Sequence, residues 1–140
     1  MPAEAAVGFE GVTPILRVRD MAASLDHYVR VLGFKVDWQS EYFASVTRGR
    51  CHIFLSYGDQ GHPGGWVWIG VEDAAALQEE YKRTGAKIRN PPTNYQWAYE
   101  MQVEDIDGNV LRMVPNRKKM SLTAIGSTWT GSAGRRCRGK

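Results

Sequence analysis

Hydrophobic and polar positions alternate along the first half of the chain in an order that predicts a strand, a helix and three more strands. The first strand is expected over residues 12–20, with Pro14 suited to a strand start or an edge. Asp20 can cap a helix over residues 21–33, which Gly33 would end. Apolar residues recur in this helix at helical spacing: Met21, Leu25, Tyr28 and Leu32. The following strands are expected over residues 34–39, 41–48 and 50–57.

The same order of elements restarts after a segment rich in glycine and proline, residues 58–65. A strand over 66–73 leads to Asp73, a second cap, and to a helix over 74–85. A short strand over 86–92 breaks at two prolines. A hairpin follows, with strands over 97–105 and 109–115 and a tight turn at "DIDGN".

The two halves form an internal repeat of about 50 residues. "ILRVRDMAASL" corresponds to "WIGVEDAAAL", and "LGFKV" corresponds to "TGAKI". We therefore predict an α+β fold of two tandem βαβββ modules, over about 12–57 and 65–115. One such half leaves a face of its sheet uncovered, so two halves are expected to form a curved mixed sheet with a cleft, with the helices on the outer face. Residues 1–11 are interpreted as a lead-in.

Charge separates this domain from the end of the chain. Residues 1–115 contain 11 Lys and Arg against 15 Asp and Glu, a net charge of −4, whereas residues 116–140 contain 7 basic and no acidic residues. We interpret 116–140 as a flexible basic tail, for which a dedicated nucleic-acid function is not expected. No run of apolar residues is long enough for a membrane span, and no secretory signal is recognised at the start.

The two cysteines, Cys51 and Cys137, lie in very different surroundings, and a structural disulfide between them is not expected. We therefore expect a cytoplasmic protein.

The segments "VTPILRVRDMAASLDHYVRVLGF" and "EMQVEDIDGNVLRMV" resemble the vicinal-oxygen-chelate superfamily, which includes glyoxalase I, fosfomycin-resistance enzymes, ring-cleaving dioxygenases and bleomycin-resistance proteins. The resemblance covers roughly residues 12–115. Within the superfamily, "YEMQVEDIDGN" looks most like the bleomycin-resistance branch, which often has a glutamate where Glu100 stands. The fold hosts many activities, so the resemblance does not select one.

The resemblance implies four positions at which metal enzymes of the superfamily carry a ligand. They are occupied here by Thr13, Phe54, Trp66 and Arg112. None is a good ligand for a divalent metal, because two lack a ligating group, threonine binds poorly and arginine would repel the cation. We therefore expect no metal and no other cofactor.

Trp66 and Trp68 share one face of their strand, and the alignment with the superfamily places that face on the cleft. An aromatic wall binds flat or cationic molecules by burial, stacking and cation–π attraction. The resemblance thus implies a binding protein that sequesters a small molecule, such as a bleomycin-type antibiotic, without altering it. It also implies a homodimer with clefts between the subunits.

Six further residues, Arg112 among them, are candidate ligand contacts, each with a plain structural alternative. His52 and Phe54 share the cleft face, although a lone strand histidine more often serves packing or hydrogen bonding. Trp97 precedes the final hairpin, and both a contact at the end of the cleft and a contact between subunits remain open. Trp38 alternates with apolar residues, which slightly favours the interior. Glu100 and Arg112 lie on the two strands of the hairpin, where an ion pair across the strands is favoured over a contact of Glu100 with a cationic ligand.

Two enzymatic alternatives remain open. One is a metal-dependent lyase, transferase or dioxygenase with displaced ligands, for which His52 and Glu100 are the plausible remnants. The other is a metal-free enzyme that uses Glu100 or His52 as a base, although the sequence identifies no partner for either. Asp105 and Asp107 are interpreted as turn residues.

Overall fold

The computed structural model describes residues 7–94 and 99–115. The first module comprises β1 (Ile15–Arg17), α1 (Met21–Arg30), β2 (Lys35–Gln39), β3 (Phe43–Arg48) and β4 (Cys51–Ser56). The second comprises β5 (Trp66–Val71), α2 (Ala74–Thr84), β6 (Lys87–Asn94), β7 (Tyr99–Glu104) and β8 (Val110–Pro115). The predicted α+β fold of two βαβββ modules is confirmed. Within the described ranges, neither helix is long and apolar enough to cross a membrane.

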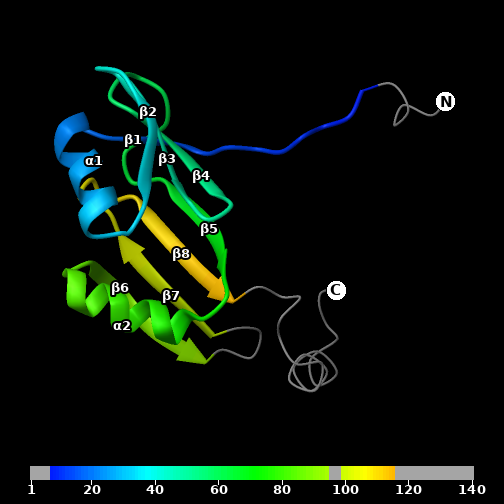
Figure 1. The fold of residues 1–140 in the computed structure, drawn as a ribbon, viewed down its shortest axis with the longest axis vertical. Coiled ribbons are helices and arrows are strands. Elements are labelled where there is room, and N and C mark those ends of the chain that lie inside the picture. Colours follow the sequence, from blue (N-terminus) through cyan, green and yellow to red (C-terminus); the bar gives the residue numbers. More distant parts are fainter. Residues whose placement is uncertain (1–6, 95–98, 116–140) are drawn as a thin grey trace.

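The two modules have the same sheet topology. The strand orders are β1-β4-β3-β2 and β5-β8-β7-β6, in two four-stranded sheets. In each sheet the first strand is parallel to the last, and the other pairs are antiparallel. Figure 1 shows the sheets one above the other, with α1 beside the upper sheet and α2 across the lower one. The duplication read from the sequence is therefore a duplication of structure.

Both helices begin at the predicted caps. Asp20 accepts a hydrogen bond from the backbone N–H of Ala23, and Asp73 accepts one from Ala76, each at 3.0 Å. These bonds satisfy a backbone donor that a helix start would otherwise leave without a partner. Gly85 ends α2 in the left-handed conformation, with φ of 85°.

Most elements are shorter than predicted, β1 most of all, since it spans Ile15–Arg17 and not 12–20. Two further ends differ from the prediction for a local reason. α1 ends at Arg30, before Gly33, whose φ is 82° and whose missing Cβ leaves space for the Arg48 guanidinium. β6 does not break at its prolines but continues to Asn94. The pairing with β7 shifts between Asn90 and Thr93, across the two prolines, and resumes at Thr93, which the edge position of β6 permits.

The modules share one hydrophobic core and meet on their helical sides. Buried residues from both halves form a single cluster, which includes Leu16, Val46, Ile53, Tyr81, Met101 and Leu111. The turn between β7 and β8 docks on the first module through Asp105, which accepts a hydrogen bond from the Tyr28 hydroxyl at 2.8 Å, and Asp107, which accepts one from Ser24 at 2.8 Å. Asp105 and Asp107 therefore act as turn residues, as predicted, and also join the modules.

α2 makes a second junction with the first module. Arg48 of β3 donates two hydrogen bonds of 2.8 Å to Glu80, and the Tyr81 hydroxyl donates one of 2.8 Å to the Leu32 carbonyl. The hydrogen bonds from Arg48 hold the pKa of Glu80 below its usual value. The ionised form of Glu80 is therefore the form that stabilises the fold.

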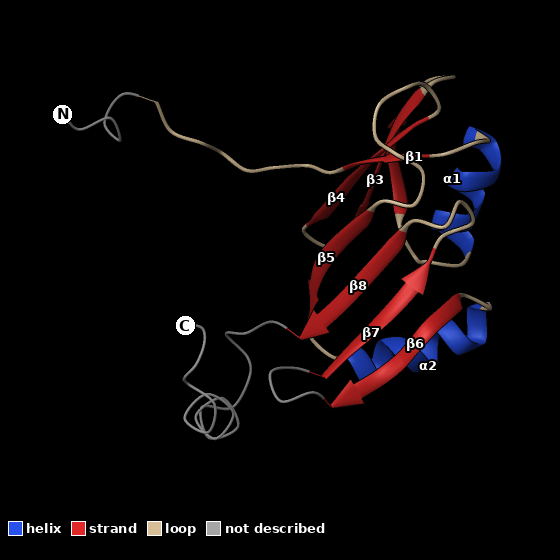
Figure 2. Cartoon of the chain, turned by 180° about the vertical axis from the view of Figure 1, so that it is seen from behind, coloured by secondary structure: helices blue, strands red, loops and turns tan. Residues whose placement is uncertain are grey.

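Each helix covers one face of its sheet and leaves the other face bare. In β4, Ile53 and Leu55 are buried beneath the helices, while His52 is exposed on the opposite face. In β5, Val67 and Ile69 pack against the core, while the alternating residues point away. Figure 2 shows α2 behind the strands of the second module and α1 beside those of the first. We refer to the uncovered sides as the helix-free faces of the first and second modules.

We predict that Glu80→Gln destabilises the protein at neutral pH by about 1 kcal/mol, because the pair with Arg48 is partly exposed to solvent. The difference from the wild type should shrink as the pH falls below about 4, where the carboxylate of the wild type becomes protonated. Urea unfolding at pH 7 and at low pH measures this. Glu79→Gln is the control, because the Glu79–Lys82 pair lies on the surface of α2. Equal losses for both variants would contradict the assignment.

Candidate functional site

Trp66 and Trp68 lie on the helix-free face of the second module. They are 54% and 57% exposed, respectively, whereas their neighbours Val67 and Ile69 pack against the core. The alternation of a strand accounts for this difference, because successive side chains point to opposite faces. The predicted placement of both indoles away from the helices is therefore observed. Half-exposed tryptophans side by side on a bare sheet face are a surface able to bind an apolar molecule.

Each of these indoles carries a guanidinium of the same chain over its ring. The Arg112 guanidinium lies 4.8 Å from the centre of the Trp68 ring, and that of Arg89 lies 5.2 Å from the centre of the Trp66 ring. Arg112 is the register partner of Trp68 on the adjacent strand β8. Trp66 and Arg89 belong to opposite edge strands of the sheet, so the long Arg89 side chain reaches across the helix-free face to the Trp66 ring. The cation–π attraction holds the indoles without burying them.

Glu100 and Arg112 form the ion pair that the sequence analysis favoured. Arg112 donates hydrogen bonds of 2.6 and 2.8 Å to the two carboxylate oxygens of Glu100, whose side chain is 1% exposed. A two-bond contact of this kind fixes the plane of the guanidinium. Glu100 thereby positions Arg112 over Trp68, and both of its carboxylate oxygens are used in doing so.

The helix-free face of the first module carries a cluster of three aromatic rings, Trp38, Phe43 and Phe54. Trp38 stacks on Phe43 with ring centres 5.9 Å apart and meets Phe54 at 5.5 Å, while Phe43 and Phe54 are 5.3 Å apart. Phe54 is thus on the face that the sequence analysis assigned to it. These rings form a second apolar surface, 49% of Trp38 being exposed.

The expectation that Trp38 faces the interior is wrong. The pairing of β2 with β3 shifts between Val36 and Trp38, so Asp37 is an extra residue in β2. This bulge turns Trp38 away from the interior side of Val36 and pairs it with Ser45. Simple alternation does not hold across a bulge.

Several polar side chains surround His52 on the helix-free face of the first module. The Thr47 hydroxyl lies 2.6 Å from Nδ1 of His52, and the Ser45 hydroxyl donates to Asp37 at 2.8 Å. The Asp37 carboxylate is 3.7 Å from His52 Nδ1. Hydrogen bonds from Ser45 and Thr47 hold the pKa of Asp37 below its usual value. His52 therefore has the partner that could not be identified from the sequence.

The two modules place corresponding charged residues on their helix-free faces. The β6–β7 pairing shifts between Ile88 and Asn90, on either side of Arg89, as the β2–β3 pairing does around Asp37. The aligned segments "GFKVDW" and "GAKIRN" put Asp37 and Arg89 at the same place in the repeat. A charged residue that interrupts an apolar alternation at equivalent positions is the signal that would have identified both.

The aromatic surfaces of the two modules are separate. Among the described residues, no ring of the Trp38–Phe43–Phe54 cluster contacts Trp66 or Trp68. Trp97, the remaining candidate, lies outside the described residues. The structure thus brings His52, Phe54 and Trp38 together on one surface, and Trp66, Trp68, Glu100 and Arg112 on another.

The positions at which the sequence resemblance implies metal ligands hold no set of ligating side chains in this chain. Trp66 and Phe54 are aromatic, and Arg112 is bound to Glu100. In the part of the chain that the structure describes, no group of three or more His, Cys, Asp or Glu side chains could hold a metal ion. Burial raises the pKa of the Cys51 thiol, which disfavours the thiolate that binds metals.

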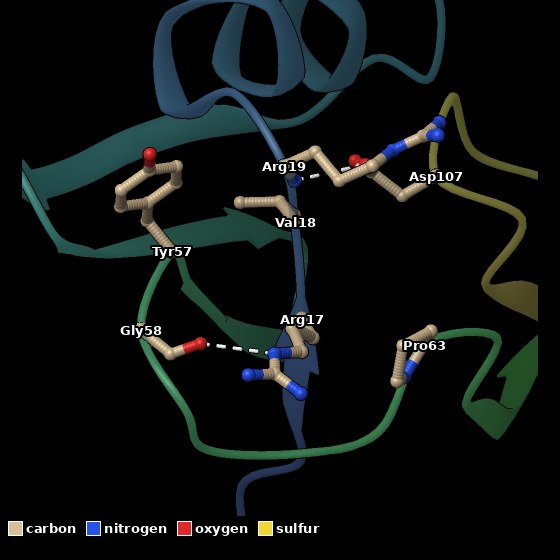
Figure 3. A pocket seen from close by; sticks show the side chains of 7 residues that line it. All are labelled: Arg17, Val18, Arg19, Tyr57, Gly58, Pro63 and Asp107. Carbon is tan, nitrogen blue, oxygen red and sulfur yellow. Dashed lines mark hydrogen bonds and ion pairs between the residues drawn. The ribbon is translucent and has the colours of Figure 1, made fainter.

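A cavity of about 650 Å³ lies elsewhere, where β1 meets the loop after β4 (Figure 3). Its polar groups largely bond one another, with Arg17 donating to the Gly58 carbonyl at 2.9 Å and Arg19 to Asp107 at 3.0 Å. Neither of the aromatic surfaces lines it. Its contacts join the first strand to two loops.

Comparisons with known proteins agree with this arrangement. Residues 10–113 match the family model of the Glyoxalase/Bleomycin resistance protein/Dioxygenase superfamily. No curated protein matches the chain in a sequence comparison.

Among solved structures, the bleomycin-binding protein of bleomycin-producing Streptomyces verticillus, complexed with copper(II)-bleomycin, is 28% identical with a TM-score of 0.69. The match covers 79% of this chain and 98% of that one. The bleomycin resistance determinant of transposon Tn5 has the same fold, with 22% identity, a TM-score of 0.68 and coverage of 77% and 98%.

We predict that Arg112→Met destabilises the protein by about 3 kcal/mol, because it leaves the buried Glu100 carboxylate without its counter-charge. The double variant Glu100→Gln with Arg112→Met should recover much of this loss, since no buried charge then remains. Chemical denaturation of the two variants measures the difference. If the single variant is as stable as the double variant, Glu100 does not depend on Arg112.

Proposed function

The chain belongs to the Glyoxalase/Bleomycin resistance protein/Dioxygenase superfamily, and we propose that it is a metal-independent binding protein of that superfamily. It sequesters a small planar aromatic or cationic molecule, of the bleomycin type, without altering it. The observation that carries this proposal is the pair of half-exposed indoles, Trp66 and Trp68, at and beside a position where metal enzymes of the superfamily have a ligand.

The area of the indoles suffices for useful affinity. Covering about 100 Å² of each ring at ~25 cal/mol per Å² contributes about 5 kcal/mol before the entropic cost of association. Because Arg89 and Arg112 lie over these rings, the cation–π position on one side is already filled by the chain. A planar ring stacked on the remaining indole surface is therefore the contact that this site favours. The net charge of −4 over residues 1–115 favours a cationic group elsewhere on the ligand.

A dimer supplies the second wall of the site in this proposal. Each chain has one aromatic surface per module, and the two surfaces do not touch within the described chain. Bleomycin-resistance proteins, which the sequence resembles, typically form dimers with clefts between the subunits. The helix-free face of one chain's first module would then oppose that of its partner's second module, and a flat ligand would lie between them.

The metal-dependent lyase, transferase or dioxygenase remains the alternative. Among the described residues, no group of side chains could hold the metal that this alternative requires. Glu100, one of the two candidate metal ligands, is bound to Arg112. A stoichiometric content of iron, manganese, nickel or zinc that survives dialysis would restore this alternative and overturn the binding proposal.

We predict that bleomycin binds the full chain and that Trp66→Ala weakens binding by at least tenfold, through the loss of stacking worth about 1.5 kcal/mol or more. Isothermal titration calorimetry measures this, and circular dichroism confirms that the variant is folded. Tyr42→Ala is the matched control, because Tyr42 is an exposed aromatic that stacks on Tyr57. Absence of any binding at high micromolar bleomycin would exclude bleomycin as a ligand.

Mixing two inactive variants tests whether the site is shared between subunits. Trp38→Ala damages the first-module surface, and Trp66→Ala damages the second-module surface. After co-refolding, a heterodimer of the two retains one site built from two intact surfaces, so binding should return at up to one site per heterodimer. Each variant alone should remain weak. If native mass spectrometry shows that heterodimers have formed and ligand binding does not recover, the site is not shared between subunits.

A further inference from the structure

The polar groups around His52 favour one position for the proton of its ring. Asp37 accepts a hydrogen bond from Ser45 at 2.8 Å, and such donors hold its pKa below the usual value, so it is ionised at neutral pH and only accepts hydrogen bonds. This carboxylate lies 3.7 Å from His52 Nδ1, and the Thr47 oxygen lies 2.6 Å from the same nitrogen. A lone pair on Nδ1 would face the negative charge, whereas an N–H there faces an acceptor. The geometry therefore favours the neutral imidazole with its proton on Nδ1.

The other nitrogen of His52, Nε2, is then an unprotonated acceptor. No described residue bonds to Nε2, and the His52 side chain is 57% exposed. Thr47, by contrast, is buried. The Thr47 oxygen and the Asp37 carboxylate, both beside Nδ1, thus orient Nε2 as an acceptor on the helix-free face of the first module.

This acceptor stands beside the aromatic cluster of the same face. His52 and Phe54 lie on one face of β4, two residues apart, and Phe54 contacts both Trp38 and Phe43. The bulge at Asp37 serves both features, since it places the carboxylate near Ser45 and His52 and turns Trp38 onto Phe43 and Phe54. A flat molecule lying on the three rings would have its edge near His52.

We propose that His52 Nε2 accepts a hydrogen bond from an N–H or O–H group at the edge of the planar ligand that stacks on Trp38, Phe43 and Phe54. The inference rests on the proposed function in taking this surface as one wall of the binding site. It defines the ligand further, as an aromatic molecule with a donor on its ring or directly beside it. A flat molecule without such a donor leaves Nε2 desolvated and is disfavoured.

The tautomer can be measured without any ligand. Nitrogen-15 NMR of histidine-labelled protein at pH 8 should show His52 protonated at Nδ1, with Nε2 bare. Thr47→Val removes the accepting oxygen with little change of shape and should shift His52 toward the Nε2-protonated form that free imidazole side chains prefer. His62, in the exposed loop before β5, is the internal reference. An Nε2-protonated His52 in the wild type would overturn the proposal.

Indole and 1-methylindole test the acceptor, because they differ in one N–H group. The wild type should bind indole about fivefold more tightly than 1-methylindole, as expected for one net hydrogen bond. His52→Phe should bind both equally, and the control His62→Phe should keep the wild-type preference. NMR titration measures these affinities. Equal binding by the wild type, or no binding of indole up to its solubility limit, would overturn the proposal.

The two proposals fail in different ways. If bleomycin does not bind but indole is preferred through His52, the assignment of the ligand to the bleomycin type is wrong and the role of His52 holds. If bleomycin binds in a manner that depends on Trp66 while indole and 1-methylindole bind alike, the proposed function holds and the role of His52 is wrong.

Discussion

A single helix covers only one face of a four-stranded sheet, and each module of this protein has a single helix. The apolar residues that point toward the helices, such as Ile53 in β4 and Ile69 in β5, form or adjoin the shared core. The residues that alternate with them cannot be buried by the same elements. The helix-free face of each sheet is therefore a consequence of the architecture, and its tryptophans remain about half exposed.

The junction between the modules preserves these bare faces. The turn containing Asp105 docks on Tyr28, and α2 docks on β3 through the Arg48–Glu80 pair, so the contacts lie on the helical sides. Burial and the neighbouring Asp105 raise the pKa of Tyr28, whose hydroxyl therefore remains a donor. On the helix-free face of the second module, the Arg112 and Arg89 guanidinium groups lie over the indole rings. An exposed apolar surface is thereby held in place without being filled.

Much of the fold could be predicted from the sequence, because local rules act on short segments. The two caps, the tight turn at "DIDGN" and the alternation in β5 each depend on a few consecutive residues, and the structure confirms them. Because the second half of the sequence repeats the first, the elements predicted for one module could also be predicted for the other. The Glu100–Arg112 pair also followed from hairpin spacing.

The rest of the candidate site depends on register. The position of Trp38 and the contact of Arg89 with Trp66 follow from irregularities in pairing that occur when two separate strands meet. The grouping of Asp37, Thr47 and His52 combines three strands and could not be obtained from alternation alone. The charged residue at equivalent positions of the repeat, Asp37 and Arg89, was the available signal.

A crystal structure of the full chain with bleomycin tests the central claim most directly, namely that the helix-free aromatic faces bind the ligand. The account predicts the planar part of the drug against Trp66 and Trp68 of one chain and against Trp38 and Phe54 of its partner. Density for the drug in the cavity beside Arg17, or a cation held among the side chains of a helix-free face, would contradict it.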